Sequence, residues 1–231
     1  GENSPIFKIR ALGQFATDDR NQLVASEWVT QAWHREKEDD GSLPKLRVSV
    51  DVGDGGLDES VVTVAKHFSS FIRGIKQVPY SFPQETASQN TADAAESLFD
   101  AHGGRKGVDD FVVDATGVGT GVAGELLKRG HSVIRYKGGS ESTNPKMWRN
   151  RRVQSYMVLR DMFRDGMIVF NEDFTEDKEE FEAQICSVKK KEGDDEVRED
   201  LVTRLQMRQD GLQSPDRADS LAMQMATQAP A

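Results

Sequence analysis

The segment at residues 46–52 constrains the fold more than any other part of the sequence. Apolar and polar residues alternate along it as Leu-Arg-Val-Ser-Val-Asp-Val. This period of two predicts a β-strand with one apolar face, and it places Asp51 on the face opposite the valines. A glycine-rich turn at 53–56 follows, and the patterns at 61–65 and 71–78 predict two more strands, joined tightly. The sheet is therefore expected to begin as an antiparallel meander.

The rest of the chain alternates short apolar runs with segments of helical periodicity. A helix containing Ala92 and Phe99 follows two capping candidates, Asn90 and Thr91. Further strands are expected at 111–113, 133–136, 167–170 and, more weakly, 196–205, and helices at 117–129, 150–164, 176–185 and from Pro215 onward. Strand and helix in alternation indicate parallel pairing. The expected fold class is α/β, an RNase H-like mixed sheet with an antiparallel meander followed by parallel strands, flanked by helices.

Residues 1–45 are expected to form an N-terminal arm that leads into one main domain at 46–231. Within the arm, a short helix is predicted at 26–33 with Ser26 as its cap, and a charged, turn-like stretch follows. The 231 residues suffice for one sizeable core when a large sheet is involved. Because the chain opens without an initiator methionine or a signal sequence, we interpret it as an excised domain whose neighbours are missing.

Composition narrows the function classes. A net charge of −9 argues against a protein that coats nucleic acid by counterion release alone. It suits an enzyme that gathers carboxylates around divalent cations, because the ions reverse the local field. No apolar run approaches the roughly 18 residues of a membrane span, so a membrane role is not expected.

Cysteine and histidine offer little for catalysis. The single cysteine, Cys186, excludes an internal disulfide and a cysteine metal cluster, and without a basic partner it is interpreted as a small buried hydrophobe. The four histidines lie beside no cysteine and in no close pair, so we interpret them as surface or packing residues; they are His34, His67, His102 and His131.

Three aspartates are the candidates for chemistry. Asp51 and Asp114 end two predicted strands, and Asp219 lies in the first turns of the last predicted helix. Two strands and one crossing helix can bring all three together, and hard oxygen ligands are what Mg²⁺ or Mn²⁺ requires. Two such ions, roughly 3.5–4 Å apart, activate water and stabilise the leaving oxygen of a phosphodiester. Each aspartate taken alone is equally compatible with a turn or helix-start role.

Three other aspartates lie close in sequence to these candidates, and we do not expect them to be the principal metal ligands. Asp216 lies three residues before Asp219 on one helical face, and we expect it to support the metal site or to stabilise the first turn. Asp54 and Asp58 flank the glycine turn and are interpreted as turn residues, although Asp58 joining the metal site stays open.

Three segments resemble, in order, the acidic motifs of the nuclease domain of tailed-bacteriophage terminase large subunits. They are VSVDVGDGGLDESVVTV from 48, FVVDATGVGTGVAGELL from 111 and SPDRADSLAM from 214. NPKMWRNRRVQSYMVLRDMF from 144 also resembles the long helix of that family, and RALGQFATDD from 10 its interdomain lead-in. The serine-proline followed by a spaced Ala-Asp is the most distinctive part.

The resemblance implies an endonuclease that cuts concatemeric viral DNA in the host cytoplasm, with two metals held by Asp51, Asp114 and Asp219. It also implies partners, namely double-stranded DNA, an N-terminal packaging ATPase domain of the same full-length protein, a small terminase subunit and a portal. No GxxxxGK[ST] phosphate loop occurs in this chain. The glycines at 117–121 are therefore interpreted as tight strand-to-helix packing rather than nucleotide binding.

Two basic clusters are candidates for DNA contact. The first, at the start of a predicted helix, comprises Lys146, Arg149, Arg151 and Arg152, and the second comprises Lys189, Lys190 and Lys191. Either can bind phosphates, and either can be a solvated face. We favour the arginine cluster, because acidic residues surround the lysines in sequence.

Three other functions stay open. An RNase H-like resolvase or integrase also uses three acids, and a resolvase would select branched DNA. An actin-like ATPase begins with a similar aspartate–glycine hairpin, but it needs a second such subdomain, for which this chain has no room. A non-catalytic docking module of the packaging motor would use the aspartates for packing or turns alone, so that changing Asp114 to asparagine would leave metal binding unchanged.

Overall fold

A computed structural model describes residues 22–53, 59–191 and 198–226. Much of the predicted arm, together with Asp54 and Asp58, lies outside these ranges. No helix within them is both long and apolar enough to cross a membrane.

One six-stranded mixed sheet organises the molecule, as the alternation pattern predicts. Its order is β5-β4-β1-β2-β3-β6. The strands are β1 (Lys45–Asp51), β2 (Ser60–His67), β3 (Ile72–Tyr80), β4 (Asp110–Asp114), β5 (Ser132–Tyr136) and β6 (Ile168–Phe170). The first three form the expected antiparallel meander, whereas β4 pairs in parallel with β1, β5 with β4, and β6 with β3. The predicted fold class is confirmed.

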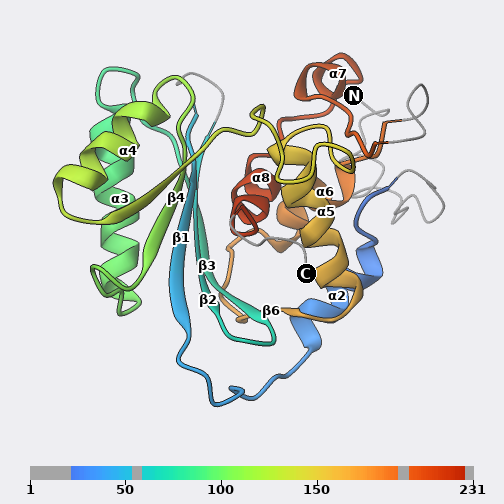
Figure 1. Cartoon of the computed structure of the whole chain (residues 1–231), viewed down its shortest axis with the longest axis horizontal. Helices are drawn as coiled ribbons and strands as arrows, with labels where there is room; N and C mark the ends of the chain where they lie inside the picture. Colours follow the sequence, from blue (N-terminus) through green and yellow to red (C-terminus); the bar gives the residue numbers. More distant parts are fainter. Residues whose placement is uncertain (1–21, 54–58, 192–197, 227–231) are drawn as a thin grey trace.

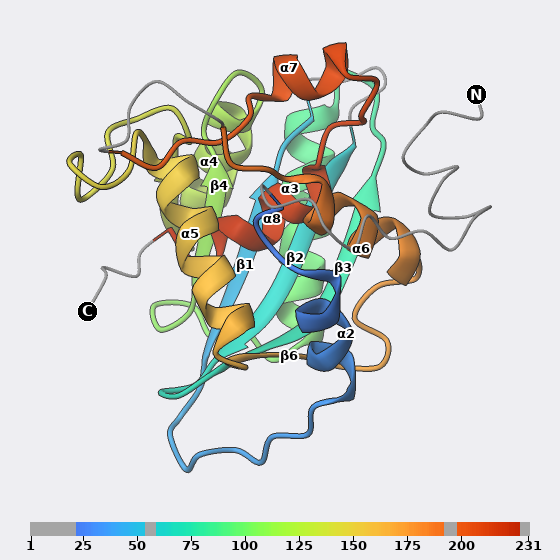
Figure 2. The same ribbon diagram turned by 90° about the vertical axis from the view of Figure 1, so that its right-hand side faces the viewer.

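Helices cover both faces of the sheet. On one face lie α3 (Ala87–Ala101) and α4 (Gly119–Lys128), at the left of Figure 1. On the other lie α2 (Ser26–His34), α5 (Arg151–Arg164), α6 (Lys178–Ser187) and α8 (Asp216–Met223). Figure 2 shows α8 lying across the sheet, with α5 and α6 on either side of it. The short α7 (Arg204–Gln209) lies at the upper end of the molecule in both views.

The two faces of the sheet differ in chemistry. Val48, Val50, Val62 and Val64 point toward α3 and α4 and form an apolar core with them. The alternate positions point toward α8, and they are largely polar: Arg47, Ser49, Asp51, Thr63 and Gln77. These polar side chains are buried beneath α8 rather than solvated. The alternation read from the sequence thus separates an apolar core from a buried polar layer.

Local predictions at helix ends were less accurate. Ser26 does not cap α2; its hydroxyl donates to Glu182 instead. Helix α3 begins at Ala87, so Asn90 and Thr91 lie inside it rather than at its start. Asn150 does cap α5, where its side chain accepts a hydrogen bond from the Val153 amide.

The weak strand pattern at 196–205 is also wrong. Its described part contains only isolated bridges, at Glu199 and Leu201, and then α7. Thr203 and Gln206 form a reciprocal capping box that starts this helix. The local cap decides the structure here because the apolar alternation is short.

Candidate functional site

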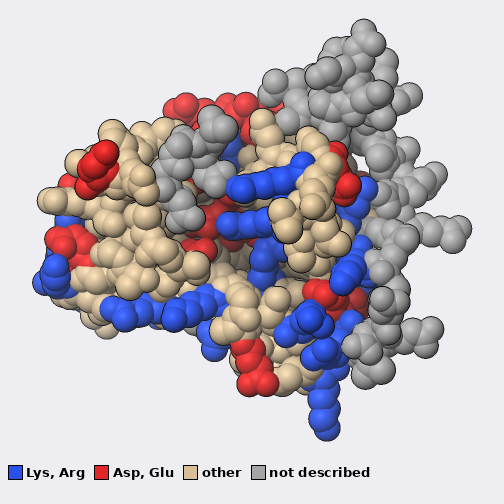
Figure 3. Space-filling model, turned by 90° about the horizontal axis from the view of Figure 1, so that it is seen from above, with Lys and Arg blue, Asp and Glu red and all other residues tan. Residues whose placement is uncertain are grey.

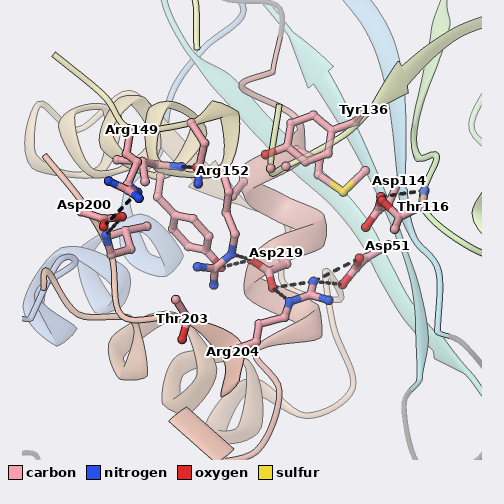
Figure 4. Close-up of a pocket in the computed structure, with 18 of the residues that line it drawn as sticks. Asp51, Asp114, Thr116, Tyr136, Arg149, Arg152, Asp200, Thr203, Arg204 and Asp219 are labelled. Atoms are coloured by element: carbon pink, nitrogen blue, oxygen red, sulfur yellow. Dashed lines mark hydrogen bonds and ion pairs between the residues drawn. The ribbon is translucent and has the colours of Figure 1, made fainter. Parts of the chain in front are cut away.

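The structure brings Asp51, Asp114 and Asp219 to one cavity of about 430 Å³. Asp51 ends β1 and Asp114 ends β4, and these parallel neighbours have their carboxyl ends at the same edge of the sheet. Asp219 comes from α8, which packs on β1 and β2. Figure 4 shows Asp51 and Asp114 near the strand ends, with Asp219 on the other side of Arg204 from Asp51. The geometry therefore gathers acids from three distant segments.

Arg204 links two of these acids. Its guanidinium Nη2 lies 3.1 Å from Asp51 Oδ2 and 2.7 Å from Asp219 Oδ2, and its Nε donates to the same Asp219 oxygen at 2.8 Å. The two carboxylate side chains are only 4% and 5% exposed, whereas the arginine side chain is 40% exposed. A cation reaching in from α7 thus neutralises a buried acidic pair (Figure 4).

The second oxygen of Asp219 is held by α5. Tyr156 donates its hydroxyl to Asp219 Oδ1 at 2.7 Å, and Arg152 Nε donates to the same atom at 3.0 Å. The Arg152 guanidinium also lies over the Tyr156 ring, 5.0 Å from its centroid. Both Asp219 oxygens consequently have fixed partners, and the orientation of this carboxylate is defined.

Burial and neighbouring charges shift the pKa values of the three acids in different directions. Burial raises the pKa of Asp51 well above its usual value, against the opposing effect of Arg204. Burial also raises the pKa of Asp114, to a smaller extent. At Asp219 burial acts in the same direction, but Arg152 and Arg204 outweigh it, so its pKa is lowered. Asp219 is therefore the most firmly ionised of the three, and Asp51 depends most on a nearby cation.

Asp114 owes its position to a tight turn after β4. Its Oδ1 accepts a hydrogen bond from the Thr116 amide at 3.1 Å. The backbone of Gly119 then passes so close that a Cβ there would lie 1.7 Å from the Asp114 carbonyl oxygen. This contact agrees with the interpretation of the 117–121 glycines as packing residues, and it makes Gly119 part of what positions the acid.

As the side chains stand, the described residues contain no group of three Asp, Glu, His or Cys that can hold one metal ion. The Arg204 guanidinium lies between Asp51 and Asp219 and bonds both. Two carboxylates that close on one positive charge, with a third in the same cavity, are a donor set of hard oxygens suited to Mg²⁺ or Mn²⁺. By donor type, the three carboxylates match such ions.

The other predicted site residues differ in where they lie relative to the cavity. Arg149, Arg152 and Lys191 line the cavity with the three acids. Asp216 is buried and accepts a hydrogen bond from Ser214, and it acts on Asp51 through its charge. The remaining basic candidates are not among the lining residues; they are Lys146, Arg151, Lys189 and Lys190. Lys190 pairs with Glu199 at 2.9 Å.

Sequence reasoning missed several lining residues, among them Tyr136, Tyr156, Asp200 and Arg204. Tyr156 lies one helical turn after Arg152, a spacing that a helical projection of α5 would have shown. Arg204 carries no such signal, because the pattern of its segment predicts a weak strand rather than the helix that the structure has.

Cys186 is partly buried, and burial raises the pKa of its thiol to about 12. That environment disfavours the thiolate that a nucleophile needs. Two of the histidines, His67 and His131, are held in polar pairs, with Gln224 and Glu96.

Comparison with solved structures decides the fold family. The nuclease domain of the large terminase subunit of bacterial virus Sf6, in a form containing manganese and β-thujaplicinol, matches with a TM-score of 0.72. The two share 22% identity, and the match covers 91% of this chain and all of that one. This chain has the fold of a terminase nuclease domain.

A second form of the Sf6 terminase nuclease domain gives a TM-score of 0.68 at 21% identity. The large terminase of a thermophilic bacteriophage, solved with ADP, matches at a TM-score of 0.54 and 13% identity. There the match covers 92% of this chain but 44% of the thermophilic phage protein. No protein-family model and no curated protein sequence matches this chain.

Proposed function

We propose that the chain is a metal-dependent DNA endonuclease that cuts concatemeric viral DNA during genome packaging. The observation that carries the proposal is the cavity in which Asp51 and Asp219 close on one cation with Asp114 beside them. The terminase nuclease fold supports the proposal, and so does the resemblance of the segments around the three acids to the family's motifs.

Asp51, Asp114 and Asp219 would hold two Mg²⁺ or Mn²⁺ ions, with Asp216 supporting them electrostatically. Such ions supply an activated water and stabilise the leaving oxygen of the phosphodiester. The protein's own contribution is orientation, because Tyr156 and Arg152 fix one oxygen of Asp219 while its other oxygen faces Asp51 across Arg204. Forms of the Sf6 nuclease domain containing manganese and calcium support divalent-metal use.

DNA would enter along the basic side of the cavity. Arg149 and Lys191 line it together with the three acids, and Figure 4 shows Arg149 on the α5 side, away from the strand ends that carry Asp51 and Asp114. Seen from above in Figure 3, Lys and Arg side chains gather around a recess in which acidic atoms are visible. A polyanion needs this arrangement, since it must approach carboxylates without meeting only like charge. Lys146, Arg151, Lys189 and Lys190 would contact phosphates further from the cut.

The working protein would include a packaging ATPase domain in the same chain, and it would act with a small terminase subunit and a portal in the host cytoplasm. The match to less than half of the thermophilic phage large terminase, solved with ADP, supports a longer natural protein. The three acids would serve this assembly as its DNA-cutting centre.

Plasmid cleavage tests the proposal. We expect nicking and linearisation with Mn²⁺ or Mg²⁺, none with EDTA, and at least a hundredfold loss of rate in Asp51→Asn, Asp114→Asn and Asp219→Asn. Asp165→Asn, on the exposed end of α5, is the control and should cut normally. Wild-type protein that neither cuts DNA nor binds Mn²⁺ would refute the nuclease and favour a docking module, whereas selective cutting of branched DNA would favour a resolvase.

A further inference from the structure

The polar layer between α8 and the sheet is built as a matched set of hydrogen bonds. We define the α8 seam as Ser49, Thr63, Gln77, Ser220 and Gln224. Each of these side chains is at most 1% exposed. Strands β1, β2 and β3 contribute one member each. Ser220 lies within α8, directly after Asp219, and Gln224 is the C-cap residue of that helix.

Ser220 and the backbone around it form the first half of the seam. The Ser220 and Thr63 hydroxyls lie 2.8 Å apart, and the Ser49 hydroxyl donates to the Ser220 carbonyl at 2.6 Å. Gln77 Nε2 donates both to the Thr63 hydroxyl at 2.8 Å and to the Arg217 carbonyl at 3.0 Å. The backbone carbonyls on either side of Asp219 thereby bond to β1 and β3, and the Ser220 hydroxyl bonds to β2.

Gln224 forms the second half. Its Nε2 donates to Ser49 Oγ at 2.9 Å and to the Thr63 carbonyl at 3.0 Å. His67 Nε2 lies 2.9 Å from Gln224 Oε1, and Arg47 Nη1 donates to the Gln224 carbonyl at 2.9 Å. The amide of one side chain thus bonds to β1 and β2 at once.

Outside the seam, the hydrogen bonds of α8 go to neighbouring helices rather than to the strands: the Arg217 amide donates to Gln184 of α6, and Asp219 accepts from Tyr156 of α5. Ala218, Leu221 and Ala222 pack into the apolar core shared with α5 and α6. Apolar contacts are non-directional, so α8 can slide while keeping much of their free energy. Hydrogen bonds weaken steeply with distance and angle. A slide of one residue, about 1.5 Å, would break most of the seam and bury its polar groups unpaired.

We propose that the α8 seam is a positioning device for Asp219, setting the register of α8 so that this carboxylate meets Asp51 at the end of β1. The proposal rests on the proposed function in that Asp219 is a metal ligand. The seam residues are positioning residues, because they do not line the cavity themselves. Ligand-supporting side chains of this kind typically change metal affinity by about 10- to 100-fold when altered.

The test compares a variant altered in the seam with a control variant altered on the opposite face of β2. Thr63→Val combined with Gln224→Met removes seam hydrogen bonds at nearly constant volume. The control, Val64→Ala, removes apolar packing on the opposite face of β2 and leaves the seam residues unchanged. Mn²⁺ affinity is measured by titration calorimetry, and thermal stability is measured alongside. We expect the seam variant to bind Mn²⁺ at least tenfold more weakly and the control to bind as wild type, although both lose stability.

Crystal structures of the metal-free variants give a readout independent of metal. A displacement of α8 along β1 in the seam variant, absent from the control, supports the proposal. Unchanged placement of Asp219 relative to Asp51, or equal Mn²⁺ affinities for the two variants, overturns it. If the pair of changes prevents folding, Thr63→Val alone serves in both measurements. Wild-type protein that binds no Mn²⁺ would refute the proposed function, while the structures would still decide the seam.

Discussion

Replacing Arg204 by methionine should lower the stability of the metal-free protein and raise its affinity for Mn²⁺. Methionine keeps much of the side-chain length and removes the charge that now lies between Asp51 and Asp219. Breaking a fully buried ion pair typically costs about 3–5 kcal/mol. Because the Arg204 side chain is 40% exposed, solvent screening reduces this, and we expect a loss of about 2 kcal/mol.

That loss has a thermal equivalent. For a chain of this size, each kcal/mol shifts the midpoint of unfolding by about 2–4 °C, so Arg204→Met should melt about 4–8 °C lower in EDTA. Mn²⁺ at one hundred times its dissociation constant adds about 2.7 kcal/mol, which should more than restore stability. If the guanidinium competes with metal, its removal should also strengthen Mn²⁺ binding by roughly tenfold or more.

Scanning calorimetry in EDTA and in Mn²⁺, with titration calorimetry of the same samples, measures both effects. Arg164→Met is the matched control, since it removes an arginine that pairs with surface acids away from the cavity. Unchanged or weaker Mn²⁺ binding in Arg204→Met would refute the competition between guanidinium and metal.

Three further outcomes follow from the structure. Gly119→Ala should cost several kcal/mol, on the order of 3, because its Cβ would collide with the Asp114 carbonyl; denaturant unfolding measures this, and a loss below about 1 kcal/mol would contradict it. Tyr156→Phe should lower kcat for DNA cleavage with KM unchanged, because it removes one of the two donors that hold Asp219 Oδ1; a change confined to KM would argue against this role. Burial lowers the pKa of His67 to about 4 from 6.5, so the unfolded state takes up the proton first as pH falls. Stability should therefore decline between pH 6.5 and 4, by about 2 kcal/mol after allowing for its partial exposure, and His67→Gln should flatten this slope in pH-dependent unfolding; an unaltered slope would count against it.

The sequence predicts the sheet well because its signals are periodic and local. The alternation at 46–52 identifies β1 and also assigns Asp51 to the face opposite the valines, where the structure has it. Short apolar runs with turns between them locate the other strands. Convergence of Asp51 and Asp114 follows from the same information, because the ends of adjacent parallel strands share one edge.

Features that depend on long-range contact are not readable in this way. Arg204 acts on Asp51 across 153 positions, and no periodicity in its segment points to the cavity. Ser49, Thr63 and Gln77 look like the solvated face of an amphipathic sheet, and only the placement of α8 makes them a buried seam. Predictions of helix starts fail for a related reason. The Ser26 hydroxyl bonds to the distant Glu182 and not to the backbone of its own helix.

A crystal of the wild-type protein equilibrated with Mn²⁺, measured at the manganese absorption edge, would locate any manganese bound in the cavity. We expect two anomalous peaks, roughly 3.5–4 Å apart, contacted by Asp51, Asp114 and Asp219, with the Arg204 guanidinium withdrawn from between the acids. A cavity without manganese, in which Arg204 still bonds both Asp51 and Asp219, would contradict this expectation.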